Sequence, residues 1–301
     1  MPSIRPDLRP EPPLLRAGTR QRLTRGWTRP AEAEGAPVVV LGGDGAFGRG
    51  RRRPWPARLA ALTGRPVLNL GVEGAGPAFL ASDVGLMAEA EAALAAGGDV
   101  VVEAAGLWAG ETRWYAAGRR QPRRLRAVSP ALRALYPELA LDGIDDLGRL
   151  LQLLHARDPA RFEQLAAEAR AVWLREAEAL LRRLGPGVLA LAPGGLAPAG
   201  GIGATAEGAR FGATAEGAPF GAGASGARLA VDAAGLTAGA PAPAEAVRLA
   251  ARRAGARAPV ETPVGASDAV VAEALAAALT RGRARRRAGA GAAGRRAAVP
   301  A

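Results

Sequence analysis

Three acidic residues stand at or just after the ends of predicted strands: Asp44, Glu73 and Glu103. The carboxyl ends of parallel strands meet at one edge of a sheet, so three carboxylates there could bind Mg²⁺ or Ca²⁺ through their oxygen atoms. No Asp-x-Asp spacing supports such a site, and an acid at a strand-to-helix turn also caps the N–H groups of the next helix. We therefore favour the capping role over metal binding, and we expect no cofactor.

Nucleophilic catalysis has few candidates in this chain. The sequence contains no cysteine, which excludes cysteine nucleophiles, zinc-thiolate sites and disulfides. Its one histidine, His155, falls late in a predicted helix and outside the glycine-rich turns. We assign it to a helix surface or a helix end, because a general base must lie within hydrogen-bond reach of the group that it activates.

Residues 112–137 form a cationic segment with seven arginines and no acid: Arg113, Arg119, Arg120, Arg123, Arg124, Arg126 and Arg133. Guanidinium groups bind sulfate, phosphate and uronate groups through paired hydrogen bonds. Trp108, Trp114 and Tyr115 stand beside these arginines, and their rings would offer flat faces to a sugar or a base. The alternative interpretation is a solvated charge run without a ligand, which is the commoner outcome.

The formal net charge of +12 comes entirely from arginine, because the chain contains no lysine. A basic chain can attract nucleic acid through its electrostatic field. The abundance of Ala, Gly, Arg and Pro indicates a general compositional bias, so a nucleic-acid partner is disfavoured. The first residues lack the apolar core of a signal peptide, and no apolar run is long enough to span a bilayer. We therefore expect a cytoplasmic protein without a membrane span.

Short aliphatic runs alternate with helical patterns along the chain, which favours a doubly wound parallel sheet. The clearest helix is 159–184, with apolar residues on one face, Asp158 as a cap and Gly185 as a stop. Strands are expected near 37–42, 65–71, 99–106, 187–192 and 257–262, and helices near 56–62, 78–96, 144–155, 159–184, 242–254 and 268–280. The predicted fold is α/β and three-layered, with about five parallel strands in a flavodoxin-like sheet and a helical insertion between strands three and four.

We expect a single α/β domain over residues 36–280, which includes an Arg-rich loop and helical insertion at 112–184 and a Gly/Ala loop at 193–228. In that loop, residues 203–211 are nearly duplicated by residues 212–220, and two copies are too few to build a solenoid. Residues 1–35 are predicted to be a mostly irregular Arg/Pro-rich arm, and residues 281–301 a disordered basic tail.

The order of these blocks resembles the SGNH (GDSL-like) hydrolase superfamily, a family of three-layer α/β proteins. The second family block, Asn-x-Gly-x-x-Gly, matches Asn69, Gly71 and Gly74, and the resemblance implies that a glycine N–H there contributes to an oxyanion hole. In the first block, Gly-Asp-Ser-x-x-x-Gly, Asp44 stands where the family has its nucleophilic serine.

Two further family positions differ. The third block, Gly-x-Asn-Asp, begins at Gly106, so that Trp108 replaces the asparagine donor. The final Asp-x-x-His block ends at Asp268, where the family has its catalytic histidine. Ser-His hydrolysis needs a hydroxyl nucleophile, a base and oxyanion donors together, so the resemblance implies the fold of a hydrolase without its usual mechanism.

A larger part of the chain, about residues 18–192, is similar to an uncharacterised bacterial SGNH-like group, domain of unknown function 6473. The shared features are an Arg-rich arm at 18–26, the turn at 69–77, an Arg-aromatic-Tyr pattern at 113–115, an Arg pair at 119–120 and a Ser-Pro-x-Leu-Arg segment at 129–138. The gene neighbourhoods of this group imply a role in surface-polysaccharide metabolism.

From these observations we expect a non-catalytic binding or accessory protein for an anionic glycan or a similar small ligand. The predicted ligand-binding residues are Asp44, Gly45, Asn69, Gly71, Gly74, Gly106, Trp108, Arg113, Trp114, Tyr115, Arg119 and Arg120. The leading alternative is a hydrolase or transferase that uses Asp44 and nearby acids, with or without a divalent metal, on a carbohydrate ester or phosphate. A third is non-specific nucleic-acid binding through the basic arm and tail. The sequence identifies no protein partner.

Overall fold

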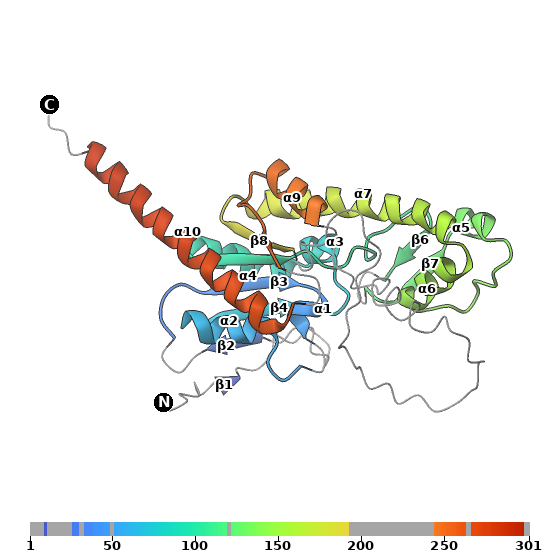
Figure 1. Cartoon of the computed structure of the whole chain (residues 1–301), viewed down its shortest axis with the longest axis horizontal. Helices are drawn as coiled ribbons and strands as arrows, with labels where there is room; N and C mark the ends of the chain where they lie inside the picture. The colour runs from blue at the N-terminus through green and yellow to red at the C-terminus, as the bar shows by residue number, and fades with distance from the viewer. Residues whose placement is uncertain are drawn as a thin grey trace.

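The computed structural model of the chain describes residues 9–10, 26–29, 33–48, 51–118, 122–192, 244–262 and 266–297. Within these residues a seven-stranded sheet has the order β1-β2-β4-β3-β5-β8-β9 (Figure 1). Its strands are β1 (Arg9–Pro10), β2 (Gly26–Arg29), β3 (Val38–Gly42), β4 (Val67–Gly71), β5 (Asp99–Glu103), β8 (Val188–Ala192) and β9 (Val260–Glu261). Five neighbouring strands of this sheet, β4, β3, β5, β8 and β9, are parallel, which confirms the predicted α/β class.

Strands β3, β4, β5 and β8 are buried along their whole length, as their aliphatic sequences require for a sheet that is covered on both faces. In sequence order the parallel strands are arranged 2-1-3-4-5, which is the flavodoxin-like order. The order reverses between β3 and β5, where ligands of such sheets bind at the carboxyl ends of the strands. The turns that follow β3, β4 and β5 therefore carry the candidate site.

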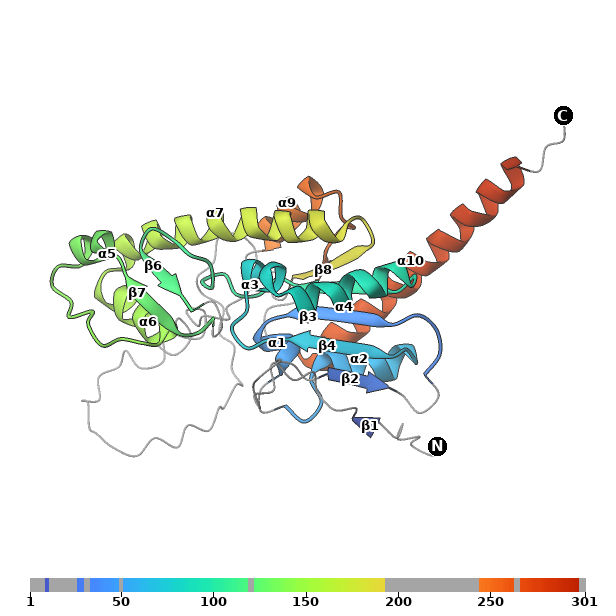
Figure 2. The same cartoon turned by 180° about the vertical axis from the view of Figure 1, so that it is seen from behind.

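Helices cover the two faces of the sheet and form the outer layers (Figures 1 and 2). One face contacts α3 (Pro77–Ser82), α4 (Val84–Ala95), α7 (Pro159–Leu184) and α9 (Ala244–Arg253) in the larger hydrophobic core. The opposite face contacts α1 (Asp44–Phe47), α2 (Trp55–Thr63) and α10 (Asp268–Ala297) in the smaller core. Alternate residues of β3 enter the two cores, since Val39 and Leu41 face the first and Val38 and Val40 the second.

Between β5 and β8 the chain forms a two-stranded antiparallel ladder of β6 (Tyr115–Ala117) and β7 (Leu125–Val128), then α5 (Pro130–Leu135), α6 (Leu147–Arg157) and α7. Figure 1 shows β6, β7, α5 and α6 gathered around the end of α7 that lies away from the sheet. The other end of α7 packs on the sheet through the larger core.

The predicted bounds of α7 are confirmed at both ends. Asp158 accepts hydrogen bonds from the N–H groups of Ala160 and Arg161, both at 3.0 Å. Gly185, with φ of 81°, follows the last helical residue. The predicted helix over 78–96, in contrast, is two helices, because Asp83 ends α3 and its side chain caps α4 by accepting from the N–H groups of Gly85 and Leu86.

The structure adds detail at both ends of the chain. The arm that was predicted to be mostly irregular contains β1 and β2, and β2 pairs antiparallel with β4 at the edge of the sheet. Helix α10 begins at Asp268 as predicted, but it extends to Ala297 through residues that were assigned to a disordered tail. Alanine and arginine have high helix propensity, and no proline interrupts the segment before Pro300.

The Gly/Ala loop at 193–228, with its duplicated nonapeptide, lies outside the described residues. None of the helices in the described part of the chain combines the length and the apolar content that a membrane span requires.

Candidate ligand site at the carboxyl ends of the strands

The turns after β3, β4 and β5 pack against each other through their backbones. Gly106 has a φ of 67°, and a Cβ atom there would lie 2.3 Å from the carbonyl oxygen of Ala75. A Cβ atom on Gly43 would lie 2.6 Å from the Cβ atom of Ala105. No side chain can be added at these contacts without moving a turn, so the three strand ends form one closely packed unit.

A buried carboxylate holds the first turn. Oε2 of Glu103, at the end of β5, accepts hydrogen bonds from the N–H groups of Gly43 and Ala46, both at 2.9 Å. A Cβ atom on Gly45 would lie 2.1 Å from Oε1 of Glu103. The Gly-Gly-Asp-Gly turn therefore wraps around this side chain, and the glycines give the carboxylate its space.

The surroundings of Glu103 act on its pKa in opposite directions. Burial raises the pKa above its usual value, and it outweighs the N–H groups of Ala46 and Gly43, which favour the charged form. The negative charge of Asp44 raises the pKa further. The indole N–H of Trp55 lowers it, although this N–H makes no hydrogen bond of normal geometry within the described part of the chain.

Asp44 stands at the start of α1 and is partly exposed. Its Oδ1 accepts a hydrogen bond of 2.7 Å from the N–H of Gly74, in the turn after β4. The carboxylate thus occupies the glycine N–H of the second turn, whereas the sequence predicted that Asp44 would cap the helix that follows it.

Asn69, on β4, connects this strand to the turn after β3 through hydrogen bonds. Its Nδ2 donates to the carbonyl oxygen of Ala46 at 2.8 Å, and its Oδ1 accepts from the N–H of Gly71 at 2.9 Å. A Cβ atom on Gly71 would lie 2.5 Å from the backbone nitrogen of Phe47. Asn69 is buried, so its amide has a positioning role and is not in contact with solvent.

The three acids that were considered as metal ligands bind different partners. Glu103 accepts from backbone N–H groups, Asp44 accepts from Gly74, and Oε1 of Glu73 lies 2.6 Å from a guanidinium nitrogen of Arg123. Among the described residues, no three acidic, histidine or cysteine side chains are grouped so that they could hold a metal ion. The geometry therefore gives no support to the metal hypothesis.

The aromatic residues predicted to contact a sugar belong to the core. Trp108, Trp114 and Tyr115 are buried, with 3%, 6% and 2% of their surface exposed. The Trp108 ring packs on Phe162 at a centroid distance of 5.2 Å, and the Tyr115 hydroxyl donates to the carbonyl oxygen of Trp108 at 2.9 Å. Their rings are covered by the β5–β8 excursion, so they offer no exposed face to a ligand.

In the described part of the cationic segment most arginines form ion pairs, and Arg124 does not. Arg113 lies on the Trp114 ring, with its Cζ 4.2 Å from the centroid, and also forms an ion pair of 2.8 Å with Glu168. Arg124 is exposed and has no acidic partner within the described residues. Arg119 and Arg120, which the sequence also predicted to bind the ligand, lie outside the described residues.

Two other candidate positions have structural partners. Asp268, at the start of α10, forms an ion pair with Arg51 in the loop that follows α1. His155, near the end of α6, packs edge-on against Phe162 with ring centroids 5.2 Å apart. Neither contact resembles a nucleophile-base pair.

Sequence reasoning missed Glu176, on the face of α7 near the turn after β5. Burial raises its pKa to about 7, Glu111 adds to this effect, and the N–H of Ala78 and the charge of Arg175 oppose it. A Cβ atom on Gly110 would lie 3.2 Å from both carboxylate oxygens. The only signal in the sequence was an acid in an otherwise unremarkable helical repeat, and this pattern does not distinguish a buried carboxylate from an exposed one.

We predict that Glu103→Ala lowers the free energy of unfolding by about 2–5 kcal/mol, because it leaves two buried N–H groups without an acceptor. Glu103→Gln keeps an acceptor oxygen, so it should lower the free energy of unfolding much less. Urea unfolding of both variants measures the difference. Equal losses would show that the hydrogen bonds to the turn are not what Glu103 contributes.

We predict that Gly45→Ala destabilises the chain by about 1–3 kcal/mol through its clash with the Glu103 carboxylate. The loss should be smaller in a Glu103→Ala background, so a double-mutant cycle by urea unfolding should give a coupling energy. Gly85→Ala is the matched control, since a Cβ atom there has 3.4 Å to its nearest neighbour, Oδ1 of Asp83. Additive effects of the two substitutions would argue against the clash.

We predict that Glu176→Gln flattens part of the pH dependence of stability. The folded-state pKa of about 7 lies above the ordinary value of 4.5, so the folded chain binds this proton more tightly than the unfolded chain does. The resulting stabilisation is complete below about pH 4.5 and is lost as the pH rises through about 7. Urea unfolding across this range is the measurement, with the exposed Glu163→Gln on the same helix as control. An unchanged slope in Glu176→Gln would contradict it.

The comparisons with known proteins identify a family but no characterised relative. No curated protein and no solved structure matches the chain. A family model described as a domain of unknown function, DUF6473, matches residues 12–206, which include β3, β4, β5, β8 and the turns of the candidate site. The chain therefore belongs to the DUF6473 family.

Proposed function

We propose that this protein is a non-catalytic binding protein on an SGNH-like frame, and that it binds an anionic glycan or a related small anion in the cytoplasm, in surface-polysaccharide metabolism. The SGNH-like part of the proposal is supported by the parallel strand order and by the Asn69-x-Gly71-x-x-Gly74 block at the end of β4. The binding part is supported by the arginines of the cationic segment.

One observation carries the non-catalytic part of the proposal: the hydrogen bond of 2.7 Å from the N–H of Gly74 to Oδ1 of Asp44. An oxyanion hole works only when its donors face the developing charge of the substrate. Here a glycine N–H of the corresponding block is bound to a carboxylate of the chain itself. The same residue supplies no hydroxyl nucleophile, so two requirements of ester hydrolysis fail at one position.

The anionic ligand is inferred from the arginines after β6. Arg124 is exposed without an acidic partner in the described residues, while Arg123, beside it, covers Gly74 and forms an ion pair with Glu73. A guanidinium fork that no acid of the chain occupies can bind a carboxylate, sulfate or phosphate through two hydrogen bonds. Arg119 and Arg120 belong to the same cationic segment and are part of the proposed site.

The experiment uses the full chain in two assays. In the first, esterase and phosphatase activity is measured on chromogenic esters with and without Mg²⁺, and we expect no turnover above background. In the second, thermal unfolding is followed with glucuronic acid, sulfated sugars and neutral sugars, and we expect an acidic sugar to raise the midpoint because it binds the folded state.

Variants decide between the proposal and its alternatives. Arg124→Ala should remove the ligand-dependent shift, and Arg149→Ala, an exposed arginine on α6, should keep it. Turnover that is lost in Asp44→Asn would overturn the proposal in favour of an enzyme. A shift that any polyanion produces, and that modest salt or Arg149→Ala abolishes equally, would indicate non-specific electrostatic binding instead.

A further inference from the structure

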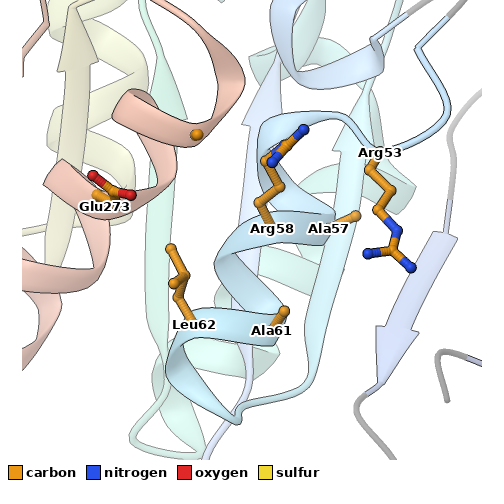
Figure 3. Close-up of a pocket in the computed structure, with 7 residues that line it drawn as sticks. Arg53, Ala57, Arg58, Ala61, Leu62 and Glu273 are labelled. Carbon is orange, nitrogen blue, oxygen red and sulfur yellow. The ribbon is translucent and has the colours of Figure 1, made fainter. Parts of the chain in front are cut away.

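A second candidate site lies on the opposite face of the sheet, in a groove between α2 and α10. The two helices contact each other at their bases through the smaller core, where Leu59 of α2 and Leu275 of α10 are fully buried. Toward solvent they leave a pocket of about 180 Å³ (Figure 3). The ion pair between Arg51 and Asp268 joins the loop before α2 to the start of α10.

The groove has a cationic wall. Arg53, in the loop before α2, and Arg58, on α2, both line the pocket and are exposed. About half of the exposed arginines of the described chain form ion pairs, for example Arg133 with Asp142 and Arg183 with Glu91. Arg53 and Arg58, in contrast, have no acidic partner among the described residues. Two positive charges at one pocket therefore remain available to an anion.

The other lining groups are apolar or acidic. Ala57, Ala61 and Ala269 line the pocket together with Leu62, which is 53% exposed. Glu273, on α10, also lines it and forms no ion pair with either arginine. Figure 3 shows Glu273 on the α10 side and the two arginines on the α2 side. The pocket thus combines donors on the α2 side with an acceptor on the α10 side, and Leu62 and Arg58 lie nearest to Glu273 in Figure 3.

We propose that this groove binds a small phosphate monoester with a hydroxylated carbon skeleton. A phosphate monoester carries a charge of about −1.5 to −2 at neutral pH, which matches two guanidinium groups better than a single carboxylate would. A carboxylate accepts hydrogen bonds from hydroxyl groups, so Glu273 would bind the end of the ligand that is distant from the phosphate. The pocket is smaller than the roughly 300–1,000 Å³ of sites for drug-sized ligands, so it suits a small ligand.

This inference does not rest on the proposed function, because the groove and the cationic segment lie on different elements. Arg53, Arg58 and Glu273 belong to the α2 and α10 side of the sheet, and Arg124 belongs to the β5–β8 excursion. Arg53→Ala therefore tests the groove and Arg124→Ala tests the proposed function, and either can fail without the other.

The test is calorimetric titration of the full chain, at near-physiological salt, with glycerol phosphate, inorganic phosphate and glycerol. We expect glycerol phosphate to bind more tightly than inorganic phosphate, and glycerol not to bind. Arg53→Ala and Arg58→Ala should each weaken binding about tenfold or more, since each removes hydrogen bonds between charged groups. Arg149→Ala removes an exposed arginine elsewhere that has no acidic partner in the described part of the chain, and it should leave the affinity unchanged.

Glu273→Gln tests the assignment of the two ends of the ligand. It should reduce the preference for glycerol phosphate over inorganic phosphate, because an amide accepts hydroxyl groups less strongly than a carboxylate does. The proposal is overturned if glycerol phosphate does not bind, if it binds no better than inorganic phosphate, if Arg149→Ala weakens binding as much as Arg53→Ala, or if Glu273→Gln leaves the preference unchanged. Circular dichroism of each variant separates a local effect from a loss of folding.

Discussion

The structure of the candidate site depends on one buried carboxylate. Glu103 crosses from β5 to the turn after β3 and accepts two backbone N–H groups there, sixty residues away for Gly43. A carboxylate that is removed from water is costly unless its oxygens are hydrogen bonded, so the glycine turn and the acid stabilise each other. Asn69 fixes the same turn from β4. The three central strands are thereby locked together at their carboxyl ends, where an α/β sheet ordinarily receives its ligand.

In this arrangement the polar groups at the strand ends form hydrogen bonds with other groups of the same chain. The N–H groups of Gly43 and Ala46 bind Glu103, and the N–H of Gly74 binds Asp44. These N–H groups therefore stabilise the packing of the strand ends. Exposed arginines without an acidic partner among the described residues are found at other places, at Arg124 after β6 and at the groove between α2 and α10.

Arginine fulfils several distinct physical roles in a chain without lysine. Arg65 is buried and bonds to Asp99 at 2.8 Å at the other end of the sheet, where it also donates to two backbone carbonyl groups. Arg113 lies on an indole ring, and Arg161 bonds to both a carbonyl oxygen and Glu138. The planar, five-donor guanidinium makes each of these contacts possible. The formal charge of +12 therefore says less about partners than do the positions of the arginines that have no acidic partner among the described residues.

The sequence by itself determined the central strands and the long helix α7. Aliphatic runs such as Val38–Leu41 indicate strands that are buried on both faces, and Asp158 and Gly185 mark the ends of α7. These features could be predicted because each depends only on residues that are close together in the sequence. Asp83 was also a local signal, and its capping of α4 could have been read from the sequence. Tertiary structure alone decided which turn Glu103 would bind, that Trp108 and Tyr115 would be core residues, and that Glu176 would be partly buried. Each of these depends on contacts between segments far apart in the chain, and residue spacing carries no information about which distant groups meet.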